Sequence, residues 1–187
     1  IAVGAWRDNA SGSGDDSGVV YVYNRSGDEF DQVGILTGSL ASDISDYFGI
    51  SVALSADGKT LVVGASQDEQ ANTAQGIVYV FDKVGTEYTE VGVLAGSDPD
   101  NADNLGYSVD VSADGNTIFA GALNGEGTGN TNYGSVHIFD RNGSSFEEVG
   151  ILTAGSLADT GDSFGCNVSA SADGKTLYVG AENDEPL

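Results

Sequence analysis

The sequence repeats itself at intervals of 57 to 60 residues. Four segments end in the same Gly-Ala pair, and the glycines of these pairs are Gly4, Gly64, Gly121 and Gly180. A repeat of this length is one supersecondary unit, which buries its faces only by stacking on its neighbours. The repeat therefore restricts the chain to a few stacked architectures.

Each full period contains four short apolar runs. In the second period they are residues 49–55, 60–65, 76–82 and 90–96. The runs are rich in Val, Ile, Leu and Tyr and are bounded by Gly, Asp, Asn and Ser, which predicts strands. Four antiparallel strands in one unit form a blade of a β-propeller. The predicted fold class is therefore all-β, with about three four-stranded propeller blades in 187 residues.

We interpret residues 1–187 as one β-propeller region. The repeat divides it into a partial blade 1–46 holding strands 2 to 4, blades 47–104 and 105–162, and a partial blade 163–187 holding strands 1 and 2. Propellers close with about four to eight blades. The chain is thus expected to be part of a larger propeller, to be completed by copies of itself, or to form an open stack.

Two connections in each period predict hairpins. The tetrapeptide Ser-Ala-Asp-Gly recurs at 55–58, 112–115 and 171–174. An Asp-Gly pair between apolar runs indicates a tight turn, because glycine adopts a positive φ without strain. A looser signal for a second hairpin recurs at 24–30, 82–88 and 140–146.

The pairs Phe48-Gly49 and Phe164-Gly165, weakened to Leu105-Gly106 in the middle repeat, precede the Gly-Ala pairs in order. With the Gly-x-Val-Tyr-Val-Phe run, this series resembles the FG-GAP repeat of integrin α-chain heads and related secreted proteins, over the whole chain. The resemblance implies a propeller of about seven blades. It also implies cell adhesion or ligand capture by a secreted or cell-surface glycoprotein that binds protein or glycan.

Calcium is often held in that family by an aspartate-rich loop between the Phe-Gly strand and the Gly-Ala strand. Here the loop is reduced to Ser-Ala-Asp-Gly, which leaves one carboxylate per blade in Asp57, Asp114 and Asp173. One carboxylate cannot supply the six to eight oxygen ligands of a calcium ion. We therefore assign no metal residue and expect no cofactor, with calcium binding without the family's loop as the alternative.

The chain is strongly acidic, with 29 Asp and Glu against 6 Lys and Arg and a formal charge of −23. This charge repels phosphate backbones and anionic lipid surfaces. No apolar stretch reaches the roughly 18 residues of a membrane span. Nucleic acid and membrane are therefore excluded as expected partners.

The acidic residues are predicted to gather on one face. In a four-stranded meander the second and fourth connections emerge together, opposite the two hairpins. That long-loop face carries Asp8, Asp15, Asp16, Asp43, Asp46, Asp68, Glu69, Asp98, Asp100, Asp103, Glu126, Asp159 and Asp162. Long loops on a rigid scaffold are where binding usually resides, so we expect a ligand or cation there. The alternative is that these carboxylates fix turns and keep the surface soluble.

Other residues invite functional interpretations. Glycosylation sequons occur at Asn9, Asn24 and Asn142, and the last two lie in predicted surface hairpins. The single histidine, His137, aligns with Tyr21 and Tyr79 of earlier repeats. We interpret it as a strand substitution and not as a general base. The single cysteine, Cys166, is interpreted as a packed thiol.

The leading functional prediction is a non-enzymatic extracellular binding or adhesion module. One alternative is an architectural unit of a filament or matrix, which associates with itself through blade edges. Another is an enzyme, since Ser-Ala-Asp-Gly-Lys-Thr-Leu also resembles a turn of lactonase-like propellers, which can bind a catalytic metal in the central channel. The first strands carry only Asp110 as an ionisable residue. We therefore predict no enzyme and assign no catalytic residue.

Overall fold

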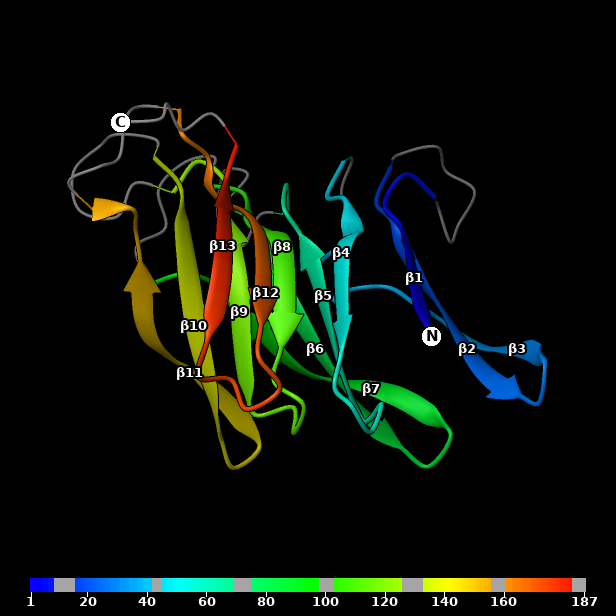
Figure 1. Cartoon of the computed structure of the whole chain (residues 1–187). Coiled ribbons are helices and arrows are strands. Elements are labelled where there is room, and N and C mark those ends of the chain that lie inside the picture. The colour runs from blue at the N-terminus through cyan, green and yellow to red at the C-terminus, as the bar shows by residue number, and fades with distance from the viewer. Residues whose placement is uncertain are drawn as a thin grey trace.

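The computed structural model describes residues 1–8, 16–41, 45–68, 75–97, 103–125, 133–155 and 161–182. In these residues the chain forms antiparallel sheets and no α-helix, and the sheets stand side by side (Figure 1). None of the described segments is a helix of the length and hydrophobicity that crossing a membrane requires.

The strands follow one another in chain order within each sheet. The first sheet contains β1 (Ala2–Ala5), β2 (Val19–Ser26) and β3 (Glu29–Leu36). The second contains β4 (Phe48–Leu54), β5 (Thr60–Ala65), β6 (Ile77–Val84) and β7 (Glu87–Leu94). The third contains β8 (Leu105–Val111), β9 (Thr117–Ala122), β10 (Ser135–Asn142) and β11 (Ser145–Leu152). The fourth contains β12 (Phe164–Ala170) and β13 (Leu177–Ala181). The prediction of an all-β fold with four-stranded antiparallel blades is confirmed.

The first strands of successive blades lie next to one another. Strand β8 contacts β4 on one side and β12 on the other. These three strands are therefore the inner strands of the propeller, and the fourth strands form its outer rim. The ends of the inner strands position the candidate site described below.

The hydrophobic core lies between the faces of neighbouring blades. Val62, Val78 and Val80 of the second blade pack with Val109 and Ile118 of the third in one buried cluster. Burying apolar surface at about 25 cal/mol per Å² stabilises this stacking. Because each face is completed only by the next blade, the blades depend on one another for their cores.

A Phe-Gly pair forms a β-bulge at the start of β4 and of β12, and Leu105-Gly106 forms the same bulge in β8. In β4 the pairing with β5 shifts between Phe48 and Ser51, and Gly49 has a φ of 87°. Such a conformation is strained for residues with a Cβ and easy for glycine. The bulge bends the strand, and Phe48 stays fully buried against Tyr79. The motif therefore fixes the direction in which the chain starts each new blade.

The two hairpins of each blade lie at the same end of the sheets (Figure 1). The Ser-Ala-Asp-Gly turns of neighbouring blades are hydrogen-bonded to one another, since Ala56 N donates to Ala113 O at 3.0 Å and Ala113 N donates to Ala172 O at 2.9 Å. Within a turn, the carboxylate of Asp57 accepts from Ser55 Oγ and Lys59 N, both at 2.9 Å. The turn aspartates therefore shape the hairpins.

Candidate functional site

A hollow of about 310 Å³ opens at the end of the inner strands β4 and β8 that lies away from the hairpins. Its lining residues come from three successive blades and are Trp6, Tyr47, Ile50, Ser66, Gln67, Asn104, Tyr107 and Leu123. We call it the axial hollow. It lies on the face that the sequence analysis predicted for ligand binding, but its lining is aromatic, apolar and amide-bearing, with no carboxylate.

Two lining residues hold the left-handed backbone conformation. Tyr47 has a φ of 60° and Asn104 a φ of 59°, and Ser163 repeats this conformation in the next blade with a φ of 56°. Each of the three directly precedes the first residue of an inner strand. Strained residues of this kind persist only where the surrounding structure over-determines them. The backbone at the mouth of the hollow is therefore tightly fixed.

The side chain of Asn104 ties two blades together at the hollow. Its Nδ2 donates to Ser66 O at 3.0 Å, and its Oδ1 accepts from Asn124 Nδ2 at 2.5 Å. Both hydrogen bonds hold a buried amide in one orientation. Asn104 is thus a fixed wall of the hollow.

Trp6 closes the hollow on the side of the first blade. Its indole contacts the Tyr47 ring edge-to-face, with centroids 4.7 Å apart, and Arg7 Cζ lies 4.2 Å from the indole centroid. The indole is thus held between an aromatic ring and a cation. Trp6 is thus both packed against its neighbours and part of the lining.

Some of the predicted acidic residues lie within the described part of the chain, and the others lie outside it. Those within the described part are Asp8, Asp16, Asp46, Asp68, Asp103 and Asp162, and those outside it are Asp15, Asp43, Glu69, Asp98, Asp100, Glu126 and Asp159. Four of the first group are buried, with exposed fractions of 1% to 6%: Asp46, Asp68, Asp103 and Asp162. A ligand-binding role for these residues stays a prediction.

Two of the loop aspartates bind tyrosines of the blade's third strand. The Tyr79 hydroxyl donates a short hydrogen bond to Asp68, and Tyr21 donates to Asp8 Oδ2 at 2.5 Å. Burial, followed by the hydrogen bond to Asp68, raises the pKa of Tyr79 well above its usual value. The hydrogen bond to Asp8 raises the pKa of Tyr21. These pairs fasten the long loops to the blades.

The third blade replaces this pair with a different network. His137 stands in the position of Tyr79, and Gly125 in that of Asp68. Ser135 Oγ lies 3.2 Å from His137 Nε2, and His137 Nδ1 lies 2.5 Å from Glu148 Oε1. The order of these contacts is that of a Ser-His-acid catalytic triad. Sequence reasoning missed this network. The alignment of His137 with tyrosines gave no sign of Glu148, which contacts it from the neighbouring strand β11.

The surroundings of this network favour a structural role. Ser135 is only 1% exposed, and a nucleophile must reach its substrate. Glu148 also accepts from Ser97 N at 3.1 Å, just as Glu90 of the second blade accepts from Ser39 N at 2.9 Å. Because the second blade makes the same blade-to-blade contact without a histidine, we assign the network to packing between blades.

The inner strands do not offer a metal site in the described residues, where no three His, Cys, Asp or Glu side chains gather closely enough to hold an ion. Asp110 accepts from Val111 N at 2.8 Å and from Ala170 N at 2.7 Å, so both of its oxygens bind backbone amides. The inner strands of the described part therefore do not present the ligands of a channel metal.

The remaining candidates have clear positions. Asn24 and Asn142 lie at the hairpin ends of β2 and β10 and are at the surface, whereas Asn9 lies outside the described residues. Glycosylation of these residues stays a prediction. Cys166 is a free thiol, half-buried in β12.

Comparison with known proteins identifies the repeat. The model of the FG-GAP repeat family matches residues 31–81, which run from β3 through the bulge at Phe48-Gly49 to β6. Residues 31–81 are therefore similar to an FG-GAP repeat. The integrin-like resemblance holds at the level of this family only. No curated protein sequence matches the chain significantly.

Two solved structures resemble this chain in fold. The first is the periplasmic gluconolactonase of Pseudomonas aeruginosa, with a TM-score of 0.54 and 17% identity over 95% of this chain and 46% of that protein. The second is a putative 6-phosphogluconolactonase from Bacteroides uniformis, with a TM-score of 0.52 and 17% identity over 89% of this chain and 44% of that protein. The chain thus spans about half the length of these propellers, and at this identity the likeness shows the fold.

These matches correct the functional prediction. The expected non-enzymatic adhesion or architectural module is contradicted, because the solved structures that share this fold are named a gluconolactonase and a putative 6-phosphogluconolactonase. The physical reason is that the FG-GAP residues lie inside the contacts between blades. They specify architecture, and function must be argued from the site. Secretion and the binding of a protein or glycan partner stay predictions.

Proposed function

We propose that the chain is part of a propeller enzyme that hydrolyses a sugar lactone bound in the axial hollow. The observation that carries the proposal is the aromatic and amide-lined hollow at the end of the inner strands, on a fold shared with a gluconolactonase. Whether the chain acts alone or with further blades around the same axis, these residues form one wall of the site.

The lining suits a small sugar ring. The axial hollow has a volume of about 310 Å³, which is at the lower end of the range of about 300–1,000 Å³ for small-molecule sites. The rings of Trp6, Tyr47 and Tyr107 offer apolar surface to the C–H face of a sugar. Gln67 and the two tyrosine hydroxyls offer hydrogen bonds to its hydroxyl groups.

The charge of the site favours a neutral lactone over a phosphorylated one. Of the chain's basic residues, only Arg7 belongs to the long-loop face, and its guanidinium stacks on Trp6. The formal charge of the chain is −23. A phosphate group would be repelled by this surface and would lack the cluster of basic donors that phosphate sites use. We therefore expect the substrate class named for the first solved structure and not that named for the second.

Lactone hydrolysis adds water to the ester carbonyl carbon and breaks the bond to the ring oxygen, which takes a proton. The product is an open-chain hydroxy acid that releases a proton near neutral pH. Hydrogen-bond donors aimed at the carbonyl oxygen stabilise the negative charge that develops there. We propose that the residues lining the hollow bind the sugar ring and donate hydrogen bonds to the carbonyl oxygen. We expect the base that activates water to lie outside this described lining.

The single tryptophan provides a direct test. Trp6 is the only one in the chain and lines the hollow. Titration with glucono-δ-lactone, and with its open acid as a stable ligand, should give a saturable change in tryptophan fluorescence. Proton release measured with a pH indicator should exceed the spontaneous rate of lactone hydrolysis in the same buffer.

Matched tyrosine variants locate the effect. Tyr107→Ala should weaken binding about tenfold, or about 1.4 kcal/mol. Tyr178→Ala removes an exposed tyrosine of β13, far along the chain from the hollow, and should leave the affinity for the lactone unchanged. Equal losses in both variants, or no fluorescence change at any lactone concentration, would overturn the proposed site. Binding without faster proton release would overturn hydrolysis by this chain.

A further inference from the structure

The side-chain amide of Asn104 has an N–H group that the described part of the protein does not use. Asn104 is only 6% exposed and lines the axial hollow. An amide nitrogen carries two N–H groups, and one of those on Asn104 Nδ2 donates to Ser66 O. Among the described residues no other group accepts from this nitrogen. Because buried donors are rarely left without an acceptor, the remaining N–H group points to a ligand.

The orientation of this amide is fixed from both sides. Ser66 O belongs to the main chain and can only accept, so it must face the nitrogen of Asn104. On the other side, Asn104 Oδ1 accepts from Asn124 Nδ2. Turning the amide over would bring two acceptors together at Ser66 and two donors together at Asn124. The second N–H group of Nδ2 therefore keeps one direction.

The backbone that carries the amide is fixed as well. Asn104 has a φ of 59°, a conformation that asparagine adopts more readily than most residues with a Cβ. Tyr107 N donates to Asn104 O at 3.1 Å, which closes a turn just after this residue. The equivalent residues Tyr47 and Ser163 share the backbone conformation but carry no amide. Among these three positions, the fixed donor belongs to the third blade alone.

The other polar groups of the lining are less constrained. Tyr107 is 39% exposed, and a hydroxyl group rotates to suit its acceptor. No hydrogen bond within the described residues holds the side-chain amide of Gln67. A donor stabilises a developing negative charge best when its position is fixed before the reaction, because nothing then has to reorganise. Asn104 meets this condition better than Tyr107 or Gln67.

We propose that Asn104 Nδ2 donates its second hydrogen bond to the carbonyl oxygen of the lactone. This inference rests on the proposed function, and it names the group by which the hollow distinguishes a lactone from a sugar ring without a carbonyl. As water adds to the carbonyl carbon and gives its proton to the base, the carbonyl oxygen takes the negative charge. The N–H group of Asn104 stabilises that charge until the ring oxygen leaves with a proton and the C=O bond forms again.

Two stable ligands separate binding of the carbonyl from binding of the ring. Gluconolactam carries the carbonyl and resists hydrolysis, whereas anhydroglucitol has the sugar ring without a carbonyl. Titration of the whole chain with each, followed by the fluorescence of Trp6, gives two affinities. Asn104→Gly removes the amide and tolerates the φ of 59°. It should lower the affinity for gluconolactam about tenfold and that for anhydroglucitol by less than about twofold.

Ser163→Gly is the matched control, since it makes the same change at the equivalent position of the next blade, outside the lining of the hollow. It should leave both affinities unchanged. If Asn104→Gly weakens both ligands equally, or neither, the inference is overturned while the proposed sugar site stands. If the wild-type chain binds neither ligand, the proposed site is overturned together with the inference.

A second measurement does not depend on the folding of a variant. The two amide protons of Asn104 give separate signals in a proton–nitrogen NMR correlation spectrum of the wild-type chain. Saturation with gluconolactam should move one of these signals downfield and leave the signal of the proton bound to Ser66 in place. Anhydroglucitol should move neither signal. Equal responses to the two ligands would overturn the assignment of the carbonyl to Asn104.

Discussion

The carbonyl oxygen of Gly106 lies so close to Gly64 that a Cβ atom on Gly64 would be 1.9 Å from it. The same oxygen accepts a hydrogen bond from Ser51 Oγ at 2.7 Å. Gly121 and Gly165 repeat the contact one blade further, at 2.0 Å. The glycine of the Gly-Ala pair and the glycine of the following Phe-Gly pair are thus two sides of one contact between blades.

This contact predicts that Gly64→Ala destabilises the protein by about 3 kcal/mol, because the new methyl group must displace a backbone carbonyl. Urea unfolding followed by circular dichroism measures the change in the free energy of unfolding. Gly34→Ala is the control, since a Cβ there meets nothing within 4 Å, and its effect should stay within about 0.5 kcal/mol. Equal stability of the two variants would contradict the role assigned to the motif.

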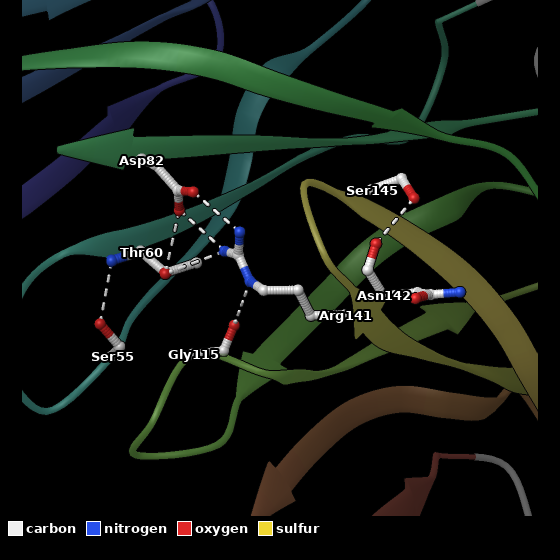
Figure 2. A network of polar contacts seen from close by, with 7 residues as sticks. All are labelled: Ser55, Thr60, Asp82, Gly115, Arg141, Asn142 and Ser145. Atoms are coloured by element: carbon white, nitrogen blue, oxygen red, sulfur yellow. Dashed lines mark hydrogen bonds and ion pairs between the residues drawn. The ribbon is translucent and has the colours of Figure 1, made fainter. Parts of the chain in front are cut away.

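Arg141 Nη1 and Nη2 donate to the two carboxylate oxygens of Asp82, each at 2.8 Å, and so bridge the second and third blades (Figure 2). The pair should therefore show energetic coupling between blades. Its side chains are 16% and 29% exposed, so solvent screens the bidentate contact only in part. A double-mutant cycle with Arg141→Ala and Asp82→Ala should give a coupling energy of about 1–2 kcal/mol. The exposed pair Arg25–Asp28 supplies the comparison and should give about 0–0.5 kcal/mol. A coupling energy for Arg141–Asp82 no larger than this would show that the bridge adds nothing.

The turn aspartates predict a loss of stability in acid. The backbone amide of Lys59, then its side chain and the Ser55 hydroxyl, lower the pKa of Asp57 from 3.8 to about 2. A carboxyl whose pKa is depressed in the folded state stabilises the protein above its unfolded pKa and loses that contribution as the pH falls through the folded pKa. The stability advantage of the wild type over Asp57→Asn should therefore shrink between about pH 4 and pH 2. Carboxyl carbon NMR titration should show Ser55→Ala raising the pKa of Asp57, and an unchanged pKa would contradict this account.

The buried Tyr79–Asp68 contact predicts that Tyr79→Phe costs about 1–3 kcal/mol, because Asp68, which is 1% exposed, loses a hydrogen-bond donor. Tyr178→Phe, at an exposed position, should be neutral. In an alkaline absorbance titration, Tyr79 should stay protonated beyond the pH at which exposed tyrosines ionise, since its pKa is raised by burial. Ionisation of Tyr79 together with the exposed tyrosines would show that the contact is not formed.

The strands and turns could be predicted because their signals are local. Runs such as 60–65 alternate with Asp-Gly turns within a few residues, and the structure places β5 over Thr60–Ala65. The repeat aligned His137 with Tyr21 and Tyr79, and all three stand at the same position of the third strand. Turn chemistry and period-two patterning act over short distances, so one sequence was enough.

The candidate site could not be predicted in the same way. The axial hollow joins residues as far apart as Trp6 and Leu123, which share no local pattern. The acidic face was inferred from loop positions, yet Asp46 and Asp103 are buried. Ser135 lies two residues before His137 in β10, but Glu148 contacts His137 only after β10 and β11 pair.

The sequence by itself determined the repeat, the four-stranded blade, the turns and the strong negative charge, since each depends on residues that are close in the chain or simply counted. The tertiary structure alone decided which glycines touch, which aspartates are buried, and that uncharged aromatic and amide groups surround the axial hollow. Those features arise where blades about 60 residues apart meet. The spacing of such contacts is set by packing between sheets, which no local pattern encodes.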